Sequence, residues 1–280
     1  MLDAILDAVL DTLKLLPFLF ITYLLMEYIE HKTSEKSKET IKKSGKYGPA
    51  IGAILGAVPQ CGFSVSATNL YAGRVITVGT LVAIYLSTSD EMLPILISSG
   101  TNFGLIIEIV LVKIIIGIIA GMAIDFIYRK SKKKDEQEKH IHDLCEHDHC
   151  HCEEGILKSA IKHTLQIFVF ILIVSIILNI VLTLIGEDIL ANFILQNKIL
   201  APALACAIGL IPNCASSVVL TELFTGGIIG IGTLIGGLLV NSGLGIMVLF
   251  KVNKNIKENI KIVFWLYLIG IVSGIIIEII

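Results

Sequence analysis

Pro-Gln-Cys-Gly-Phe-Ser, residues 59–64, decides the fold because a related stretch, Pro-Asn-Cys-Ala-Ser-Ser, occurs at residues 212–217. A constant shift of 153 residues (212 − 59 = 153) relates the two stretches, and it also holds for the last apolar segment of each half. Positions that match across the shift include Gly56, Thr68, Gly73, Gly79, Thr80, Leu81, Ser89, Gly117, Gly121 and Asp125, the last of which corresponds to Glu278. A repeat of this length indicates two copies of one structural unit.

The composition is that of a membrane protein. Hydrophobic residues make up 55% of the chain and charged residues 16%, which is outside the range of ordinary soluble domains. Some apolar runs approach or exceed the roughly 20 residues that cross a bilayer, namely residues 12–29, 104–128, 158–185 and 262–280. Shorter apolar segments punctuated by Pro or Gly lie between them, at residues 48–59, 62–73, 75–88, 201–212, 215–225 and 227–241. The sequence therefore predicts an all-α integral membrane protein.

Basic residues are concentrated in a few loops and set the expected orientation. They are Lys32, Lys36, Lys38, Lys42, Lys43 and Lys46, then Arg129, Lys130, Lys132, Lys133 and Lys134, and finally Lys251, Lys254, Lys257 and Lys261. By the positive-inside rule these loops face the cytoplasm. We expect both termini and the stretches around residues 90–91 and 187–188 to face outside. The predicted location is the cell inner (plasma) membrane, with several crossings and a cytoplasmic central loop.

These orientations predict two inverted-topology repeats. An odd number of crossings is needed between the basic first linker, which faces the cytoplasm, and the acid-flanked fourth loop, which faces outside, and three short helices would supply it. Each repeat then has about five transmembrane segments. The first repeat covers residues 1–128, a cytoplasmic linker covers 129–154 and the second repeat covers 155–280. An alternative stays open, in which the short segments form a re-entrant hairpin and one full span.

Pro59 and Pro212 each interrupt an apolar segment. A proline inside a helix removes a backbone donor and displaces the carbonyl group four residues earlier, which would leave the carbonyl oxygens of Leu55 and Ile208 unpaired. Non-helical backbone at membrane depth is tolerated only where protein or a water-filled cavity covers it. We therefore expect the Pro-broken half-helices to meet near the midplane and to form a polar centre there.

Cys61 and Cys214 follow the two breaks, where new half-helices are expected to start near Gly62 and Ala215. A helix N-terminus lowers the pKa of a thiol and favours the thiolate, which binds soft metals. Two cysteines at matching breaks are hard to explain by packing, whereas Cys206 stands alone in an apolar stretch and is typical of a packed small hydrophobe. The sequence therefore assigns Cys61 and Cys214 to the transport site.

Other polar residues accompany each break. Gln60 and Asn213 belong to the breaks themselves and offer amide oxygens. Residues that follow at helical spacing, and so can face the centre, are Ser64, Thr68 and Asn69 in the first copy and Ser217, Thr221 and Glu222 in the second. A carboxylate at membrane depth is costly and usually functional, which makes Glu222 a candidate metal ligand or proton carrier. The alternative is a side chain that reaches the membrane interface.

The central linker is rich in metal ligands. They are His140, His142, Cys145, His147, His149, Cys150, His151 and Cys152. Imidazole and thiolate groups at this density bind Zn, Cu, Ni or Cd ions, although the spacing does not match a closed zinc site. The alternative is a solvated linker that only joins the two repeats. In either case we expect the loop to be dispensable for transport itself.

Several motifs resemble one family. The run from Pro59 to Ser64, the stretches 79–81 and 87–91, and the run from Pro212 to Ala215 are similar to those of the ten-helix heavy-metal exporters, which are labelled arsenic efflux proteins or manganese transporters. The resemblance covers nearly the whole chain outside the central loop. It implies export of a metal or metalloid through a ten-helix permease.

The sequence predicts a secondary transporter and not an enzyme. It contains no GxxxxGK[ST] phosphate loop and no soluble domain large enough to hydrolyse ATP. Two thiolates suit a trivalent organoarsenical, whereas amides, hydroxyls and Glu222 suit Mn(II), and the loop would concentrate cations, so the sequence favours a divalent cation. The metal is expected as cargo and not as a cofactor. Lipid is the expected partner and nucleic acid is not, while homo-oligomerisation is left open.

Two other function classes stay open. A permease for a small sulfur-containing anion would use Cys61, Cys214 and the half-helix dipoles to bind the anion. An intramembrane thiol redox protein is the other class. It is disfavoured because no Cys-x-x-Cys pair and no His near either break is present to act as a base.

Overall fold

The described part of the chain is helical, as the sequence predicts. This computed structural model describes residues 47–58, 62–89, 92–131, 201–212 and 214–279, together with scattered positions within 9–24 and 161–177. The long segments predicted at residues 12–29 and 158–185, and nearly all of the central loop, lie outside the described residues. The described helices are α3 (Gly48–Gly56), α4 (Gly62–Ala72), α5 (Val78–Ser87), α6 (Met92–Ser98), α7 (Phe103–Ser131), α11 (Ala201–Gly209), α12 (Cys214–Thr225), α13 (Ile231–Val240), α14 (Gly245–Val252) and α15 (Ile256–Ile279).

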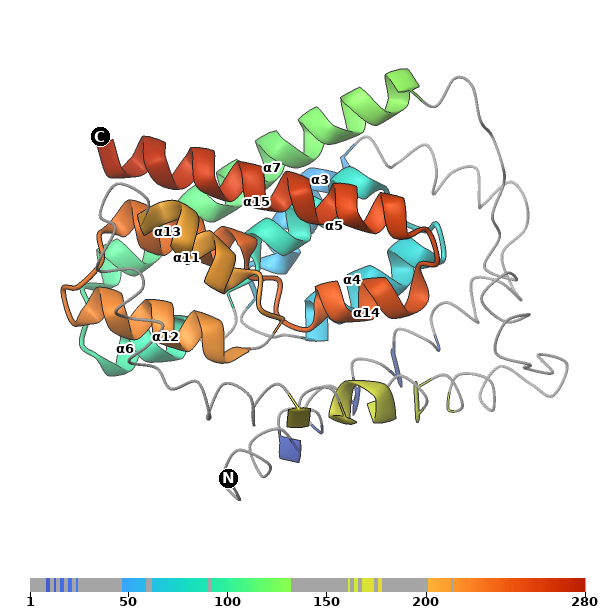
Figure 1. Cartoon of the computed structure of the whole chain (residues 1–280), viewed down its shortest axis with the longest axis horizontal. Coiled ribbons are helices and arrows are strands. Elements are labelled where there is room, and N and C mark those ends of the chain that lie inside the picture. Colours follow the sequence, from blue (N-terminus) through green and yellow to red (C-terminus); the bar gives the residue numbers. More distant parts are fainter. Residues whose placement is uncertain are drawn as a thin grey trace, which may run out of the picture.

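These helices correspond in pairs. At the shift of 153 residues, α3 to α7 match α11 to α15 in order. Their neighbours correspond as well, because α5 packs against α3 and α7 while α13 packs against α11 and α15. By contrast, α4 packs against α14 of the other half, and α12 packs against α6. In Figure 1, α7 runs from left to right and α15 from right to left. The two halves therefore interlock through these exchanged contacts.

In the first half, α3 and α4 form an antiparallel hairpin. α3 runs beside α5 in the same direction, since Gly48 approaches Thr80 and Gly56 approaches Ser87. α4 leads into α5 through the turn at residues 73–77 and packs against α5, so it runs the other way. The break at Pro59 therefore lies between the two helices of a hairpin. The second half repeats this arrangement around Pro212.

In the second half, α11 and α12 form the equivalent hairpin. α11 packs along α13, and Gly209 approaches the backbone of Gly237. α12 meets α13 in the opposite direction, because Leu220 contacts Gly237 while Ser216 accepts a hydrogen bond from Asn241 at 3.1 Å. Of the two arrangements that the sequence left open, the packing favours the hairpin followed by one interrupted helix.

Among the described residues, four stretches are long and apolar enough to cross a membrane: Val78–Ser98, Phe103–Tyr128, Ile231–Val252 and Ile256–Ile279. The first contains α5 and α6, and the third contains α13 and α14. α6 and α14 are not among the segments that the sequence predicts, and the stretch around residues 90–91 is predicted to face outside. Residues 90 and 91 lie outside the described part of the chain, whereas Thr88 and Ser89, which precede them, are buried, at 2% and 1% exposure. α5 therefore ends at buried residues inside the bundle.

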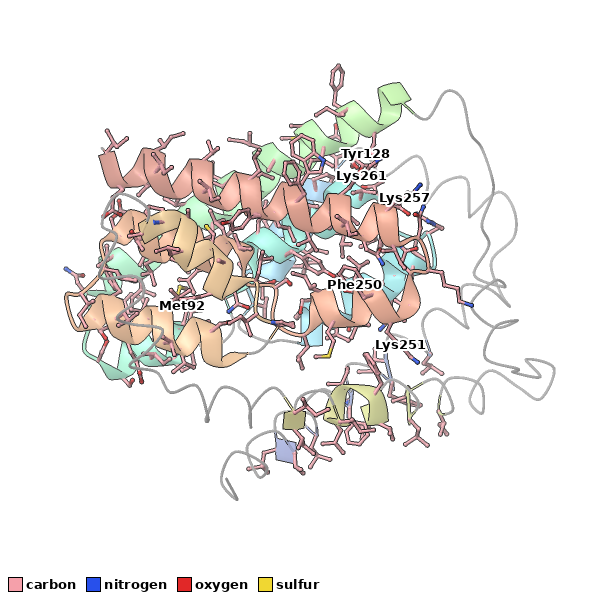
Figure 2. All side chains as sticks on the ribbon, in the orientation of Figure 1. Met92, Tyr128, Phe250, Lys251, Lys257 and Lys261 are labelled. Carbon is pink, nitrogen blue, oxygen red and sulfur yellow. The ribbon has the colours of Figure 1, made fainter. Side chains whose placement is uncertain are left out.

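The long helices α7 and α15 each present an apolar face to the surroundings. Their exposed residues recur four positions apart, which places them on one side of a helix. They are Ile107, Leu111, Ile115 and Ile119 on α7 and Ile260, Phe264, Leu268 and Val272 on α15. Figure 2 shows side chains that project from α15 away from the other helices. Apolar exposure on this scale indicates contact with lipid.

Glycines bring the long helices close to α5 and α13. α7 and α15 each contain a Gly-x-x-x-Gly motif, which ends at Gly121 and Gly274. A Cβ added at Gly79 would lie 2.1 Å from the carbonyl oxygen of Gly121, and one added at Gly232 would lie 2.5 Å from that of Gly274. Such close backbone packing is typical of membrane helices that meet through small residues.

Two equivalent carboxylates cap the interrupted helices. Oδ1 of Asp125 accepts the backbone N–H of Gly79 at 2.8 Å, and Oε2 of Glu278 accepts the backbone N–H of Thr233 at 2.7 Å. Each carboxylate satisfies a backbone donor in the first turn of α5 or α13, where the helix dipole also favours negative charge. The correspondence of Asp125 with Glu278 in the repeat therefore has a structural role.

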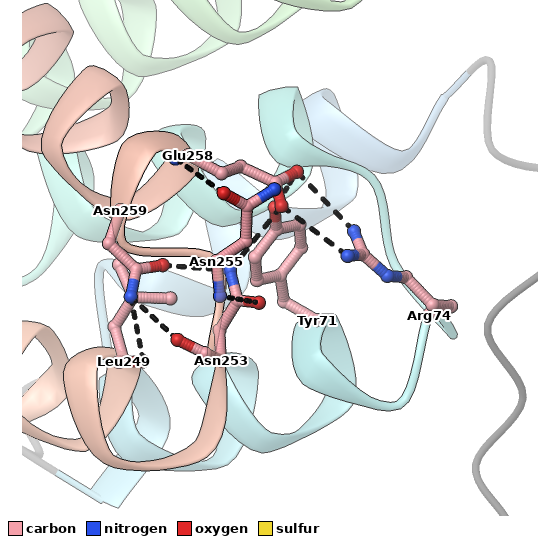
Figure 3. Close-up of polar contacts among 7 residues, drawn as sticks. All are labelled: Tyr71, Arg74, Leu249, Asn253, Asn255, Glu258 and Asn259. Atoms are coloured by element: carbon pink, nitrogen blue, oxygen red, sulfur yellow. Dashed lines mark hydrogen bonds and ion pairs between the residues drawn. The ribbon is translucent and has the colours of Figure 1, made fainter. Parts of the chain in front are cut away.

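A polar cluster joins α4 to the start of α15 (Figure 3). The hydroxyl of Tyr71 donates to Oε1 of Glu258 at 2.6 Å, and the guanidinium of Arg74 lies 3.4 Å from both carboxylate oxygens. Arg74 has a φ of 59°, in the left-handed region, where its counterpart Gly227 has a φ of 71°. We call Tyr71, Arg74 and Glu258 the latch, because they hold this strained turn against α15. The cluster is extended by Asn253, Asn255 and Asn259.

Replacing Glu258 with glutamine is expected to lower the free energy of unfolding by about 1–2 kcal/mol. The variant keeps the shape of the side chain but loses the ion pair to Arg74 and the charge-assisted bond from Tyr71. Thermal unfolding of the detergent-solubilised protein would measure the change. Glu108→Gln, which alters an exposed carboxylate on α7, is the matched control. Equal melting temperatures for the two variants would contradict a stabilising role for the latch.

Candidate functional site

A small pocket lies where the two halves meet. Residues from the α5–α6 break, α6, α12 and α13 form its walls: Thr88, Ser89, Met92, Ser217, Leu238 and Asn241. Met92, labelled in Figure 2, comes from α6. Thr88 and Asn241 are equivalent positions (241 − 88 = 153), so both halves contribute the same position to one pocket. The hydroxyl and amide side chains of this lining can donate or accept hydrogen bonds and offer oxygen ligands.

Equivalent threonines in α4 and α12 form the same hydrogen bond. Oγ1 of Thr68 donates to the carbonyl oxygen of Ser64 at 2.7 Å, and Oγ1 of Thr221 donates to that of Ser217 at 2.7 Å. All four side chains are buried. The structure brings these residues to the junction of the halves, and Ser217 lines the pocket. Thr68 lies 3.2 Å from the carbonyl oxygen of Gly245 in α14.

Asn69 and Glu222 are equivalent in sequence but differ in environment. Asn69 is buried in α4, at 2% exposure, whereas Glu222 is exposed on α12 and is absent from the pocket lining. Glu222 therefore does not contribute to the lining of this pocket.

The predicted sulfur and amide ligands at the breaks are largely beyond the described part of the chain. Gln60, Cys61 and Asn213 lie outside it, as do the His and Cys residues of the central loop. α12 begins at Cys214, whose side chain is not described. Within the described ranges no group of three or more His, Cys, Asp and Glu could hold a metal ion. Cys206 is fully buried and packs against glycines of α13 and α15, in agreement with its assignment as a small hydrophobe.

The helix breaks occur beside the prolines, as the sequence predicts, but one expected consequence is wrong. α3 and α11 end before Pro59 and Pro212, and α4 and α12 begin just after them. The carbonyl oxygen of Leu55 accepts the N–H of Val58 at 3.2 Å, and that of Ile208 accepts an N–H from the turn that follows at 3.0 Å. These carbonyls therefore keep hydrogen-bond partners, because the chain tightens into a turn before it reaches the proline.

Lys113 is a buried charged residue near the pocket that is not among the predicted site residues. It is fully buried in α7, and its Nζ donates to the carbonyl oxygen of Thr88, which lines the pocket. It lies about 15 Å along the helix from Phe103, near the middle of a candidate span. Glu108 is exposed on the same helix, so the two side chains lie on different faces of α7. The available signal was a lysine in a long apolar run, where its counterpart is Leu266.

These features define a helical membrane protein in which two similar halves enclose a polar pocket. The chain belongs to the family described as "Putative, 10TM heavy-metal exporter", whose profile matches residues 1–184 and 135–252. The resemblance based on the motifs around the breaks is thereby confirmed. No curated protein and no solved structure matches the chain.

Proposed function

We propose that the protein is a secondary-active permease that exports a heavy metal or metalloid from the cytoplasm through the pocket at the junction of its halves. The first candidate for the cargo is a divalent cation such as Mn(II), and the second is a trivalent organoarsenical. The observation that carries the proposal is that hydroxyl and amide side chains from both halves line one pocket inside an apolar helical bundle. Family membership supports heavy-metal export as the general activity.

The proposed topology has two inverted repeats. Lys251, Lys257 and Lys261 gather at the end of the bundle where α7 reaches Tyr128 (Figure 2), which supports a cytoplasmic location for that end by the positive-inside rule. α7 then runs inward and α15 outward. The α3–α4 hairpin would enter from the cytoplasm and the α11–α12 hairpin from outside, with their tips at the midplane. Both chain termini would face outside.

The available donors allow both classes of cargo. Hydroxyl and amide oxygens of Thr88, Ser89, Ser217 and Asn241 suit Mn(II), which prefers oxygen ligands. The thioether of Met92 is a soft donor, and it would suit a trivalent arsenical together with thiolates of Cys61 and Cys214 at the hairpin tips. We place Mn(II) first because oxygen donors form the greater part of the lining.

Alternating access would follow from the interlocked halves. Helices α4 and α14 form one exchanged pair and α12 and α6 form the other. Rocking of these pairs about the junction would open the pocket first to one side and then to the other, as in other transporters built from inverted repeats. The absence of a phosphate loop from the sequence supports coupling to a proton gradient or to the membrane potential.

The test is growth of a metal-sensitive bacterial host on a panel of metals and arsenicals. Wild-type protein is expected to restore growth on Mn(II) or on a methylated trivalent arsenical and to lower the cell content of that species. Cys61→Ser and Cys214→Ser are expected to lose at least about tenfold of the resistance if a thiolate is a ligand, since each removes a soft donor. Cys206→Ser, at a packed cysteine in α11, is the matched control.

Each rival function has a distinct outcome. An anion permease would take up sulfite or thiosulfate and leave metal resistance unchanged. A thiol redox protein would change the oxidation state of partner thiols without changing the metal content of the cell. Full resistance in both Cys61→Ser and Cys214→Ser cells, at unchanged expression, would show that the thiolates do not bind the cargo. Export would be contradicted if host cells that express the wild-type protein were as sensitive as the empty host to every metal and arsenical tested.

A further inference from the structure

The pocket has an equivalent position on the other side of the junction, and a tyrosine occupies it. Shifting the lining residues by 153 positions gives what we call the twin position: Ser64, Tyr85, Thr88, Asn241, Ser242 and Gly245. Thr88 and Asn241 belong to both sets, so the two positions share a wall. They differ at Leu238, which corresponds to Tyr85, and at Met92, which corresponds to Gly245.

Tyr85 is tightly packed at the twin position. It is fully buried, and its hydroxyl oxygen lies 2.5 Å from Oγ1 of Thr68. A Cβ added at Gly245 would lie 2.8 Å from a ring carbon of Tyr85 and 3.0 Å from Cβ of Ser64. The ring therefore takes the space that a side chain at position 245 would need. Glycine at this position and the hydroxyl of Thr68 together accommodate the tyrosine.

The pocket has the same frame without the tyrosine. Thr221, the counterpart of Thr68, is buried and donates to the carbonyl oxygen of Ser217 just as Thr68 does to that of Ser64. Leu238 is shorter than tyrosine and has no hydroxyl group. Thr221 could therefore be the hydrogen-bond partner of a tyrosine at position 238. The residue at this position is leucine, however, and the space beside it stays open.

We infer that the protein holds its cargo at a single site, the pocket beside Leu238, and that Tyr85 closes the equivalent site in the other half. Leu238 then leaves the pocket open for the cargo, and Tyr85 prevents a second cargo from binding at the twin position. The identity of the cargo rests on the proposed function. The location of the open site rests only on the packing around Tyr85 and Leu238.

The first arm of the test measures transport. Leu238→Tyr is expected to lower efflux of Mn(II) or methylarsenite from proteoliposomes at least about tenfold, because the ring fills the pocket as Tyr85 fills the twin position. If the larger ring perturbs the fold, Leu238→Tyr combined with Met92→Gly reproduces the twin position completely. Tyr85→Leu is expected to retain efflux, because the working site is untouched.

The second arm does not depend on the cargo. In full-length protein with the native cysteines replaced by serine, Ser217→Cys is expected to react with a small methanethiosulfonate reagent, and Leu238→Tyr is expected to slow that reaction at least about tenfold. Ser64→Cys is expected to be unreactive until Tyr85→Leu opens the twin position. Melting temperatures within a few degrees of wild type would show that the variants are folded.

The outcomes separate the two proposals. Normal efflux by a folded Leu238→Tyr variant would overturn the single-site inference and leave export intact. Equal reactivity of Ser64→Cys and Ser217→Cys in the presence of Tyr85 and Leu238 would also overturn it. If wild type transports neither probe but the reactivity pattern is as expected, the proposed cargo is wrong and the open site is still located in the pocket.

Discussion

Replacing Gly79 with valine is expected to abolish folded protein. A Cβ at this position would lie 2.1 Å from the carbonyl oxygen of Gly121 and 2.5 Å from the carboxylate of Asp125. Backbone cannot yield as a flexible side chain can, so α5 and α7 would have to separate. Overpacking of this kind costs about 3 kcal/mol or more, a large part of the stability of an ordinary domain. Fluorescence-detected size-exclusion chromatography would show loss of the monodisperse peak.

Two further variants give this result its meaning. Gly232→Val alters the counterpart of Gly79, where an added Cβ would lie 2.5 Å from the carbonyl oxygen of Gly274, and it should be about as damaging. Gly104→Val places the same side chain near the start of α7, where the nearest atom is Oδ1 of Asn102 at 3.3 Å, and it should be tolerated. A monodisperse Gly79→Val protein would show that the α5–α7 contact is less close than described.

Replacing Lys113 with leucine is expected to lower transport at least about tenfold while the melting temperature changes little. Leucine is the natural residue at the counterpart position, Leu266, which is also fully buried, so the substitution should pack. The variant loses the hydrogen bond from Nζ to the carbonyl oxygen of Thr88. Leaving a buried carbonyl without its partner costs about 1–3 kcal/mol. This carbonyl belongs to Thr88, which lines the pocket.

Efflux and thermal unfolding of Lys113→Leu should be measured together. Lys254→Leu, which removes an exposed lysine from the turn between α14 and α15, is the control for loss of a positive charge. A folded Lys113→Leu protein with normal efflux would show that the tie to Thr88 does not shape the pocket. Loss of folded protein would instead assign Lys113 to stability alone.

The repeat made most of the fold predictable from the sequence. The shift of 153 residues correctly pairs every described helix of the first half with one of the second, and the predicted half-helix starts at Gly62 and Ala215 lie within one residue of the observed starts. The matching of Asp125 with Glu278 marked two carboxylates that cap equivalent helices. Residues that are repeated at a fixed spacing make the same contacts in both halves. The repeat therefore indicates contacts that hydropathy alone does not reveal.

The interrupted helices were harder to predict. The stretch at residues 90–91 lacks a basic cluster and is therefore predicted to face outside, and the sequence does not predict α6 and α14. A helix that breaks inside a bundle also needs polar groups at the break, and hydropathy does not distinguish that case from a surface loop. Thr88 and Asn241 are absent from the predicted site for this reason, although both line the pocket. The importance of Lys113 depends on a contact with Thr88, 25 residues away, which periodicity in an apolar helix does not reveal.

Covalent fusion of the two halves has a consequence for how such a molecule can evolve. An assembly of two identical subunits would carry tyrosine, or leucine, at both positions 85 and 238, and arginine or glycine at both 74 and 227. After duplication within one chain, each copy was free to diverge. Two fused repeats can therefore differ at equivalent positions, with Tyr85 filling one position and Leu238 leaving the other open. Two identical subunits of a homodimer cannot differ in this way.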